Sequence, residues 1–262
     1  MNDGTRLEAV LKRDRMIVLS GLAGVSALVW AYLFYLTEGM RNMDTGIEPA
    51  MPHMQAWEGL DLVLMFAMWA VMMVAMMVPS AALVVLLFAT INRKRREQQG
   101  LFVPTAVFLL GYLVVWMGFS ALATLVQWGL HTAASLSPSL VSTGPILGGV
   151  LLAAAGIFQW TPLKHACLAH CRSPLGFFMT EWREGTRGAL LMGLKHGSYC
   201  VGCCWLLMSL LFLTGVMNLL WMATLTAFVL LEKIAPAGQW VSRVAGLLLI
   251  GWGMWMAAGV LF

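Results

Sequence analysis

Residues 60–91 read LDLVLMFAMWAVMMVAMMVPSAALVVLLFATI, and this run determines the fold class. Asp61 is its one charged side chain, and the run is far longer than the about 20 apolar residues that carry a helix across a bilayer. Over all 262 residues, 60% are hydrophobic and 11% are charged, whereas an average soluble domain has about 25% charged residues. With a mean hydropathy of +0.82, the sequence predicts an all-α polytopic membrane protein whose surroundings are a lipid bilayer.

Six further apolar runs bring the number of predicted spans to about seven, all within one transmembrane domain over residues 1–262. The predicted spans cover residues 16–36, 60–91, 101–130, 146–168, 188–214, 219–231 and 244–262. Pro79 interrupts the second span and Pro162 interrupts the fourth. Because the first run is too long for the core of a signal peptide and no small-residue cleavage site follows it, we expect it to be retained.

Basic residues cluster in alternate loops of this arrangement. They precede the first span and recur at residues 93–96, 172–187 and 233–243, while the loop over residues 38–58 is mainly acidic. The positive-inside rule therefore places the N-terminus in the cytoplasm. Nucleic-acid binding is excluded, because the sequence offers no basic face on a soluble domain.

Cysteine and histidine are concentrated in two segments near the predicted cytoplasmic ends of the fourth and fifth spans. In helical geometry one segment places an imidazole and three thiols on a stripe about 100° wide, and the other groups two thiols and an imidazole at i, i+3 and i+4. The candidate ligands are Cys167, His170, Cys171, His196, Cys200, Cys203 and Cys204. Thiolates and imidazoles suit copper or zinc, and a thiolate-rich set favours Cu(I). Lys164 and Lys195 would lie beside the thiolates and lower their pKa.

A methionine stripe follows one face of the predicted second span. Met65, Met68, Met72 and Met76 share this face with Asp61 at its outer end. Thioethers bind soft cations, so the stripe could lead an ion from outer carboxylates to inner thiolates. Among the 20 methionines of the chain, these four could equally serve to fill gaps between membrane helices.

Small residues recur in the predicted fourth span, at Gly148, Gly149, Ala153 and Gly156. Such residues let the backbones of membrane helices approach closely. We therefore expect this span to pack tightly against another helix.

Several short motifs carry a family resemblance. They are MMVPS at residues 76–80, TPLK at 161–164, HCRSP at 170–174, YC at 199–200, GCCW at 202–205 and EK at 232–233. With them, the sequence resembles the bacterial domain of unknown function 2182 family, which is described as predicted metal-binding integral membrane proteins. The resemblance runs from about residue 60 to the C-terminus and implies a metal-binding role.

We expect the protein to lie in a bacterial inner membrane, to bind a soft metal, copper before zinc, and to handle or deliver it to a membrane or periplasmic protein partner. Enzymatic activity stays open, although motifs of nucleotide-driven pumps and soluble-type hydrolases are missing from the sequence. One alternative is a membrane thiol–disulfide oxidoreductase with Cys200 and Cys203 as the active pair and Cys167 and Cys171 as the relay. Its cytoplasmic location argues against it, since that compartment keeps thiols reduced. The other is a non-catalytic scaffold subunit of a membrane complex.

Overall fold

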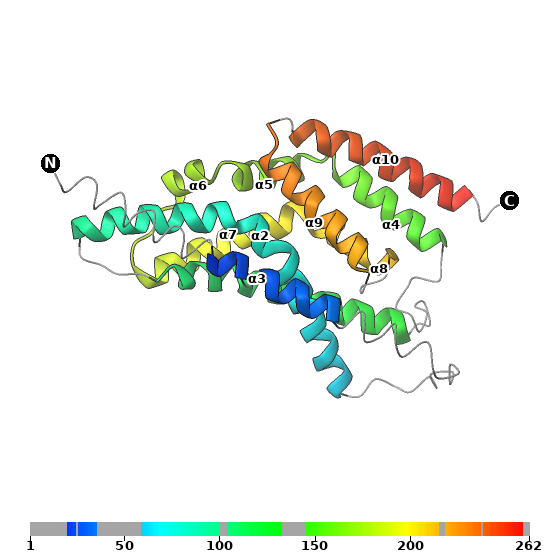
Figure 1. The fold of residues 1–262 in the computed structure, drawn as a ribbon. Helices are drawn as coiled ribbons and strands as arrows, with labels where there is room; N and C mark the ends of the chain where they lie inside the picture. Colours follow the sequence, from blue (N-terminus) through cyan, green and yellow to red (C-terminus); the bar gives the residue numbers. More distant parts are fainter. Residues whose placement is uncertain are drawn as a thin grey trace.

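The computed structural model describes residues 20–24, 26–35, 59–99, 104–132, 145–214, 218–236 and 238–258, and almost all of them are helical (Figure 1). No β-strand occurs within these ranges, so the predicted all-α class is confirmed for them. Four helices are long and apolar enough to cross a membrane, and they support an integral membrane protein. They are α2 (Gly59–Gln99), α3 (Thr105–Thr132), α7 (Gly185–Ser209) and α10 (Gly238–Ala258).

Shorter helices complete the described part of the chain. They are α4 (Pro145–Phe158), α5 (Pro162–Arg172), α6 (Pro174–Glu181), α8 (Leu211–Thr214) and α9 (Leu219–Ile234). Residues 20–24 and 26–35 are helical as well and lie in the predicted first span. The basic segment before residue 16, the acidic loop over residues 38–58 and the last residues of the predicted seventh span fall outside the described ranges.

The two prolines act differently on their helices. Pro162 ends the predicted continuous run 146–168, because α4 stops at Phe158 and α5 begins at Pro162 itself. Thr161 is extended, with φ −72° and ψ 144°, and its hydroxyl accepts a hydrogen bond from the Lys164 amide as the N-cap of α5. Pro79 instead stays inside α2, and this helix bends sharply along its length in Figure 1, because proline removes one backbone donor and clashes with the preceding turn.

Helices α3 and α7 pack with their backbones in contact. A Cβ atom on Gly193 of α7 would collide with the carbonyl oxygen of Phe108, and one on Gly111 of α3 would collide with that of Leu190. Glycine is therefore required at this crossing. The close approach positions the buried face of α7 against α3. This face of α7 carries Cys200, Cys203 and Cys204.

The predicted tight packing of residues 148–156 is confirmed. A Cβ atom on Gly149 would lie 2.7 Å from the Gly253 carbonyl oxygen, and one on Gly156 would lie 2.6 Å from that of Gly246. Both partners belong to α10. The small residues of α4 thus let it pair closely with α10, as Figure 1 also shows.

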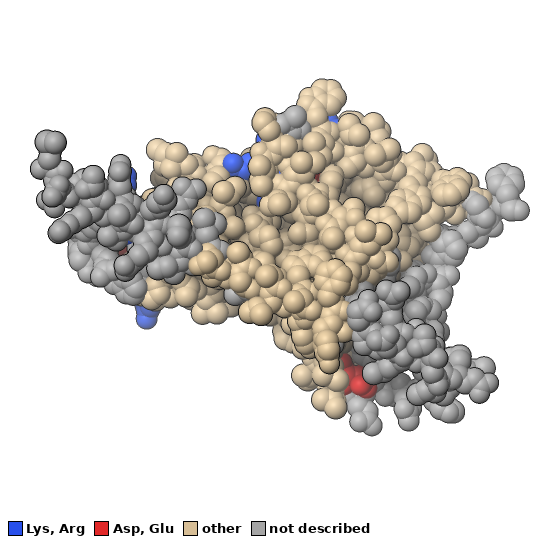
Figure 2. All heavy atoms as spheres, viewed as in Figure 1, with Lys and Arg blue, Asp and Glu red and all other residues tan. Residues whose placement is uncertain are grey.

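Charged side chains are sparse on the surface drawn in Figure 2, where uncharged residues cover most of the described atoms. Large apolar side chains on α10 face outward, with Trp255 74% exposed and Leu248 69% exposed. Arg95 near the end of α2 pairs with Glu184, just before α7, at 3.0 Å. The basic segments 93–96 and 172–187 therefore lie at the same end of the molecule, as a cytoplasmic location for both requires.

Candidate metal centre

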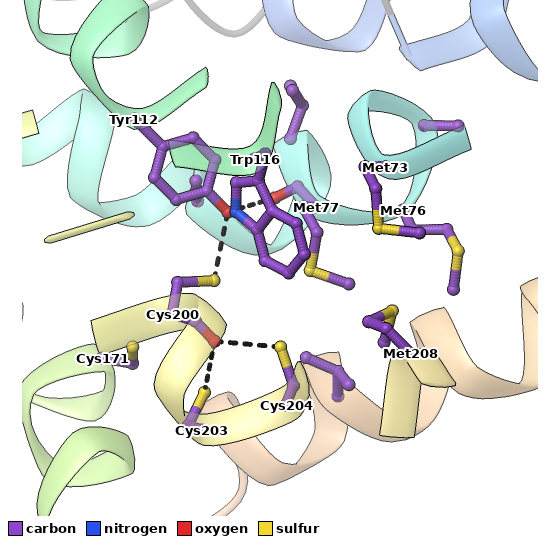
Figure 3. Close-up of a cluster of buried hydrophobic side chains, with 14 of the residues drawn as sticks. Met73, Met76, Met77, Tyr112, Trp116, Cys171, Cys200, Cys203, Cys204 and Met208 are labelled. Carbon is purple, nitrogen blue, oxygen red and sulfur yellow. Dashed lines mark hydrogen bonds between the residues drawn. The ribbon is translucent and has the colours of Figure 1, made fainter. Parts of the chain in front are cut away.

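The Cys200 sulfur lies at the meeting point of three helices. Cys200 is fully buried on α7. The Tyr112 hydroxyl of α3 lies 3.2 Å from the sulfur, and the Lys233 ammonium of α9 donates to it at 3.1 Å (Figure 3 shows the tyrosine contact). A hydroxyl and a cation next to one sulfur form an environment that suits a thiolate.

Three further cysteines lie near Cys200. The Cys203 and Cys204 sulfurs lie at the Cys200 carbonyl oxygen, and Figure 3 draws Cys171 beside the same turn of α7. Each of them is at most 7% exposed. Two helices, α5 and α7, carry these four cysteines.

The thiols are not arranged as a preformed metal site. In the part of the chain that the structure describes, no three side chains of cysteine, histidine, aspartate or glutamate adopt a metal-holding arrangement. The Cys203 and Cys204 thiols are turned back along α7 and donate to the Cys200 carbonyl oxygen at 3.1 Å and 2.9 Å. Metal ligation by these residues therefore stays a prediction.

The remaining members of the predicted ligand set on α5 lie further out. Cys167 is half-buried, and its sulfur lies against α7, 2.8 Å from where a Cβ atom on Gly202 would be. His170 stacks its ring on Tyr199 with ring centroids 4.1 Å apart, and its Nδ1 lies 2.9 Å from the Ala166 carbonyl oxygen. The structure thus brings Cys171 to the centre and leaves His170 at its edge.

His196 lies one helical turn before Cys200 and is 2% exposed. Its ring is packed against those of Phe108, Tyr112 and Phe177. Its Nδ1 has no hydrogen-bond partner among the described residues. A buried imidazole nitrogen without a partner is unusual and is free to act as a ligand.

The two lysines predicted beside the thiols have other partners. The Lys164 ammonium donates to both carboxylate oxygens of Glu232, at 2.7 Å and 3.0 Å, and to the Gln159 side chain. Lys195 pairs with Glu181 at 2.6 Å near the surface. The sequence placed both lysines close to the cysteines along the chain, but their carboxylate partners determine where the ammonium groups lie.

Lys233 is the lysine that reaches the thiols, and sequence reasoning counted it only as a loop charge. It lies in the last turn of α9, which extends to Ile234, beyond the predicted end at residue 231. Its ammonium also donates to the Ser80 hydroxyl at 2.8 Å. The one signal for it in the sequence was the EK motif at residues 232–233.

The predicted methionine stripe runs from the surface into the core. Asp61 is exposed, Met65 and Met68 are half-buried, and Met72 and Met76 are at most 1% exposed. Sequence reasoning missed three more fully buried methionines near the thiols, which Figure 3 places beside the cluster: Met73, Met77 and Met208.

Helix α2 is attached to the thiol centre by hydrogen bonds near its proline. The Tyr112 hydroxyl donates to the Met77 carbonyl oxygen at 3.2 Å, and the Ser80 hydroxyl donates to the same oxygen at 2.9 Å. This carbonyl lies two residues before Pro79, whereas the carbonyl that loses its amide partner to the proline is that of Ala75, to which the Trp30 indole donates at 3.3 Å. The MMVPS motif therefore joins the methionine-bearing helix to Tyr112 and, through Ser80, to Lys233.

A family model described as "PpoB2: Copper chaperone" matches residues 66–256. The match covers most of the chain and includes every candidate ligand, so the chain belongs to this copper chaperone family. It supports a copper-related membrane protein. No curated protein and no solved structure matches the chain.

Proposed function

We propose that this member of the copper chaperone family binds Cu(I) in the membrane with the thiols of Cys171, Cys200, Cys203 and Cys204 and delivers it to a membrane or periplasmic protein. Zinc is the alternative cargo. The observation that supports this proposal is the position of Cys200, whose sulfur contacts the Lys233 ammonium and whose carbonyl oxygen accepts from the buried thiols of Cys203 and Cys204. Thiolates are the protein ligands that Cu(I) prefers.

The charges around Cys200 suit a bound copper thiolate. Cu(I) held by two thiolates carries one net negative charge, which is costly to bury without compensation. The Lys233 ammonium, 3.1 Å from the Cys200 sulfur, supplies one positive charge. The Tyr112 hydroxyl, 3.2 Å from the same sulfur, is a neutral polar neighbour. The complex would therefore be neutral overall.

The remaining donors extend the ligand pool. Cys203 and Cys204 need only rotate their side chains away from the Cys200 carbonyl to reach an ion, and a thiol is a weak donor, so little is lost. His196 offers its free Nδ1 from one turn away. Cys167 and His170 lie at the edge and would serve as ligands during entry or release of the ion.

We also propose the finer topology of seven spans, with a cytoplasmic N-terminus in a bacterial inner membrane. Four long apolar helices and the shorter apolar helices over residues 20–35 and 147–158 support the span count. The contact between Arg95 and Glu184 supports a shared cytoplasmic side. Membership of the domain of unknown function 2182 family is proposed on the motifs given above.

Metal binding by the purified protein tests the proposal. The protein is purified without oxygen and titrated with Cu(I) against a coloured Cu(I) chelator. We expect one tightly bound ion per chain and its loss in Cys200→Ser. Ser198→Ala is the matched control, since Ser198 is exposed on the same helix and bonds only back to Leu194 in the structure.

Other outcomes would favour the competing functions. Cysteines that cycle between thiol and disulfide in cells, in a protein that takes up no copper or zinc, would indicate a thiol–disulfide oxidoreductase. A Cys203→Ala and Cys204→Ala double variant that still supports copper delivery would indicate a scaffold in which these residues only pack.

A further inference from the structure

Buried thioethers continue from the thiol centre along α2 and α7. We infer that Met73, Met76, Met77 and Met208 form a second Cu(I) site, which exchanges the ion with the thiols of Cys204 and Cys200. This inference rests on the proposed function, because it needs the thiols to bind copper. The four residues are called the thioether cluster below.

The members of the thioether cluster are completely enclosed. All four are 0% exposed, and they belong to the same buried core as the four thiols. Figure 3 shows their side chains reaching from α2 and α7 into the region beside Cys204. Met77 is held most firmly, since Tyr112 binds its carbonyl oxygen and the Ser80 hydroxyl lies 4.0 Å from its sulfur.

Packing alone does not account well for methionine at these positions. A methionine loses more side-chain entropy on burial than a leucine of similar size. Leucine would fill most of this volume with fewer rotamers to restrict. The chemical property that leucine lacks is the soft thioether sulfur, which binds Cu(I).

The chemistry of the two clusters sets the order of occupancy. Thioethers are neutral, so an ion bound by them keeps its positive charge, whereas thiolates beside Lys233 cancel it. Transfer breaks copper–thioether bonds and forms copper–thiolate bonds, and each thiol that binds releases its proton to water. Copper stays Cu(I) throughout. The thiols therefore fill first and the thioether cluster second.

The helix also offers a route to the surface. Burial falls steadily from Met76 through Met72 to the half-buried Met68 and Met65, and Asp61 at the start of α2 is exposed. Figure 2 shows carboxylate atoms at the end where α2 begins in Figure 1. A cation attracted by this carboxylate would meet a thioether at each further turn.

X-ray absorption at the copper edge tests the inference. The full-length protein is produced with selenomethionine and loaded without oxygen with one and then two equivalents of Cu(I). Selenium then marks every thioether, while the thiols keep sulfur. We expect only sulfur neighbours with the first equivalent and a selenium neighbour with the second.

A variant isolates the thioether cluster from the thiols. The first variant combines Cys200→Ser, Cys203→Ser and Cys204→Ser, and its first equivalent of Cu(I) should already have a selenium neighbour. Adding Met76→Leu and Met77→Leu to this variant should remove the selenium signal. Met179→Leu is the control, because Met179 is 78% exposed on α6. If the triple variant does not fold, the presence or absence of a selenium neighbour at the second equivalent of Cu(I) in the unaltered protein still tests the thioether cluster.

The two proposals fail in different ways. Copper bound through sulfur alone at both equivalents would overturn the thioether cluster and leave the thiol site intact. No copper bound to the unaltered protein would overturn the proposed function itself. A selenium signal that survives Met76→Leu and Met77→Leu would also overturn the cluster as assigned.

Discussion

Replacing Glu232 by methionine should lower the free energy of unfolding by about 3–5 kcal/mol, because the change leaves a buried ammonium without its partner. Lys164 binds both oxygens of Glu232, at 2.7 Å and 3.0 Å. The exposed fractions of the two side chains are 0% and 2%. Water therefore cannot compensate for the lost carboxylate.

Removing both charges should restore most of the stability. In Lys164→Met with Glu232→Met neither charge of this buried pair remains, and apolar replacements of a buried pair are often neutral or stabilising. The Ser242 hydroxyl, which donates to Glu232 at 2.6 Å, keeps a second acceptor in the Gly238 carbonyl oxygen. We expect the double variant to lie within about 1 kcal/mol of the unaltered protein, on the order of a single neutral hydrogen bond.

Reversible unfolding in mixed detergent micelles, followed by circular dichroism, measures these differences. The control is Glu181→Met, because the Lys195–Glu181 pair is partly exposed and should contribute only about 0–1 kcal/mol. Our reasoning would be refuted if Glu232→Met cost no more than this control. It would equally be refuted if the double variant were as unstable as the single one.

Three further outcomes follow from the same structure. Lys233→Met should weaken Cu(I) binding roughly 10- to 150-fold, since a hydrogen bond to a charged group contributes about 1.5–3 kcal/mol, and chelator competition measures it. Gly193→Leu should lower the free energy of unfolding by about 4 kcal/mol or more, or prevent folding, because its side chain would meet the Phe108 carbonyl. Gly118→Leu should leave the protein folded and stable, because a Cβ atom there has nothing within 4 Å. Cu(I) at about 100 times its dissociation constant should raise the unfolding free energy by about 2.7 kcal/mol, and a chelator or Cys200→Ser should abolish the increase.

Composition and local spacing were sufficient for the features that one helix determines. The stripe of His196, Cys200, Cys203 and Cys204 is buried as a unit on α7, because spacings of three and four residues fix a helical face whatever surrounds it. The break at Pro162 was equally local, since it follows from a missing amide and a threonine cap.

Features that depend on distant partners could not be derived in this way. Cys171 and His170 are neighbours on α5, yet one is in the thiol centre and the other stacks on Tyr199. Lys164, predicted beside the thiols, pairs instead with Glu232, far along the chain, and Lys233 contacts Cys200. A helical wheel gives the angle between side chains but does not say which neighbouring helix each one meets.

The state of the thiols bears on whether the proposed copper site delivers or stores its ion. A structural metal site is closed, with its ligands already converged and deprotonated. Here two thiols are hydrogen-bonded to the Cys200 carbonyl, so binding must rotate them and release protons, and both steps reduce the net affinity. An ion held in this way can be given up when a partner offers thiolates that are already prepared. The opposite risk is that the site binds its ion too weakly. The Lys233 ammonium limits this risk, since it keeps the Cys200 sulfur ready to bind the ion while the Cys203 and Cys204 thiols are still turned away.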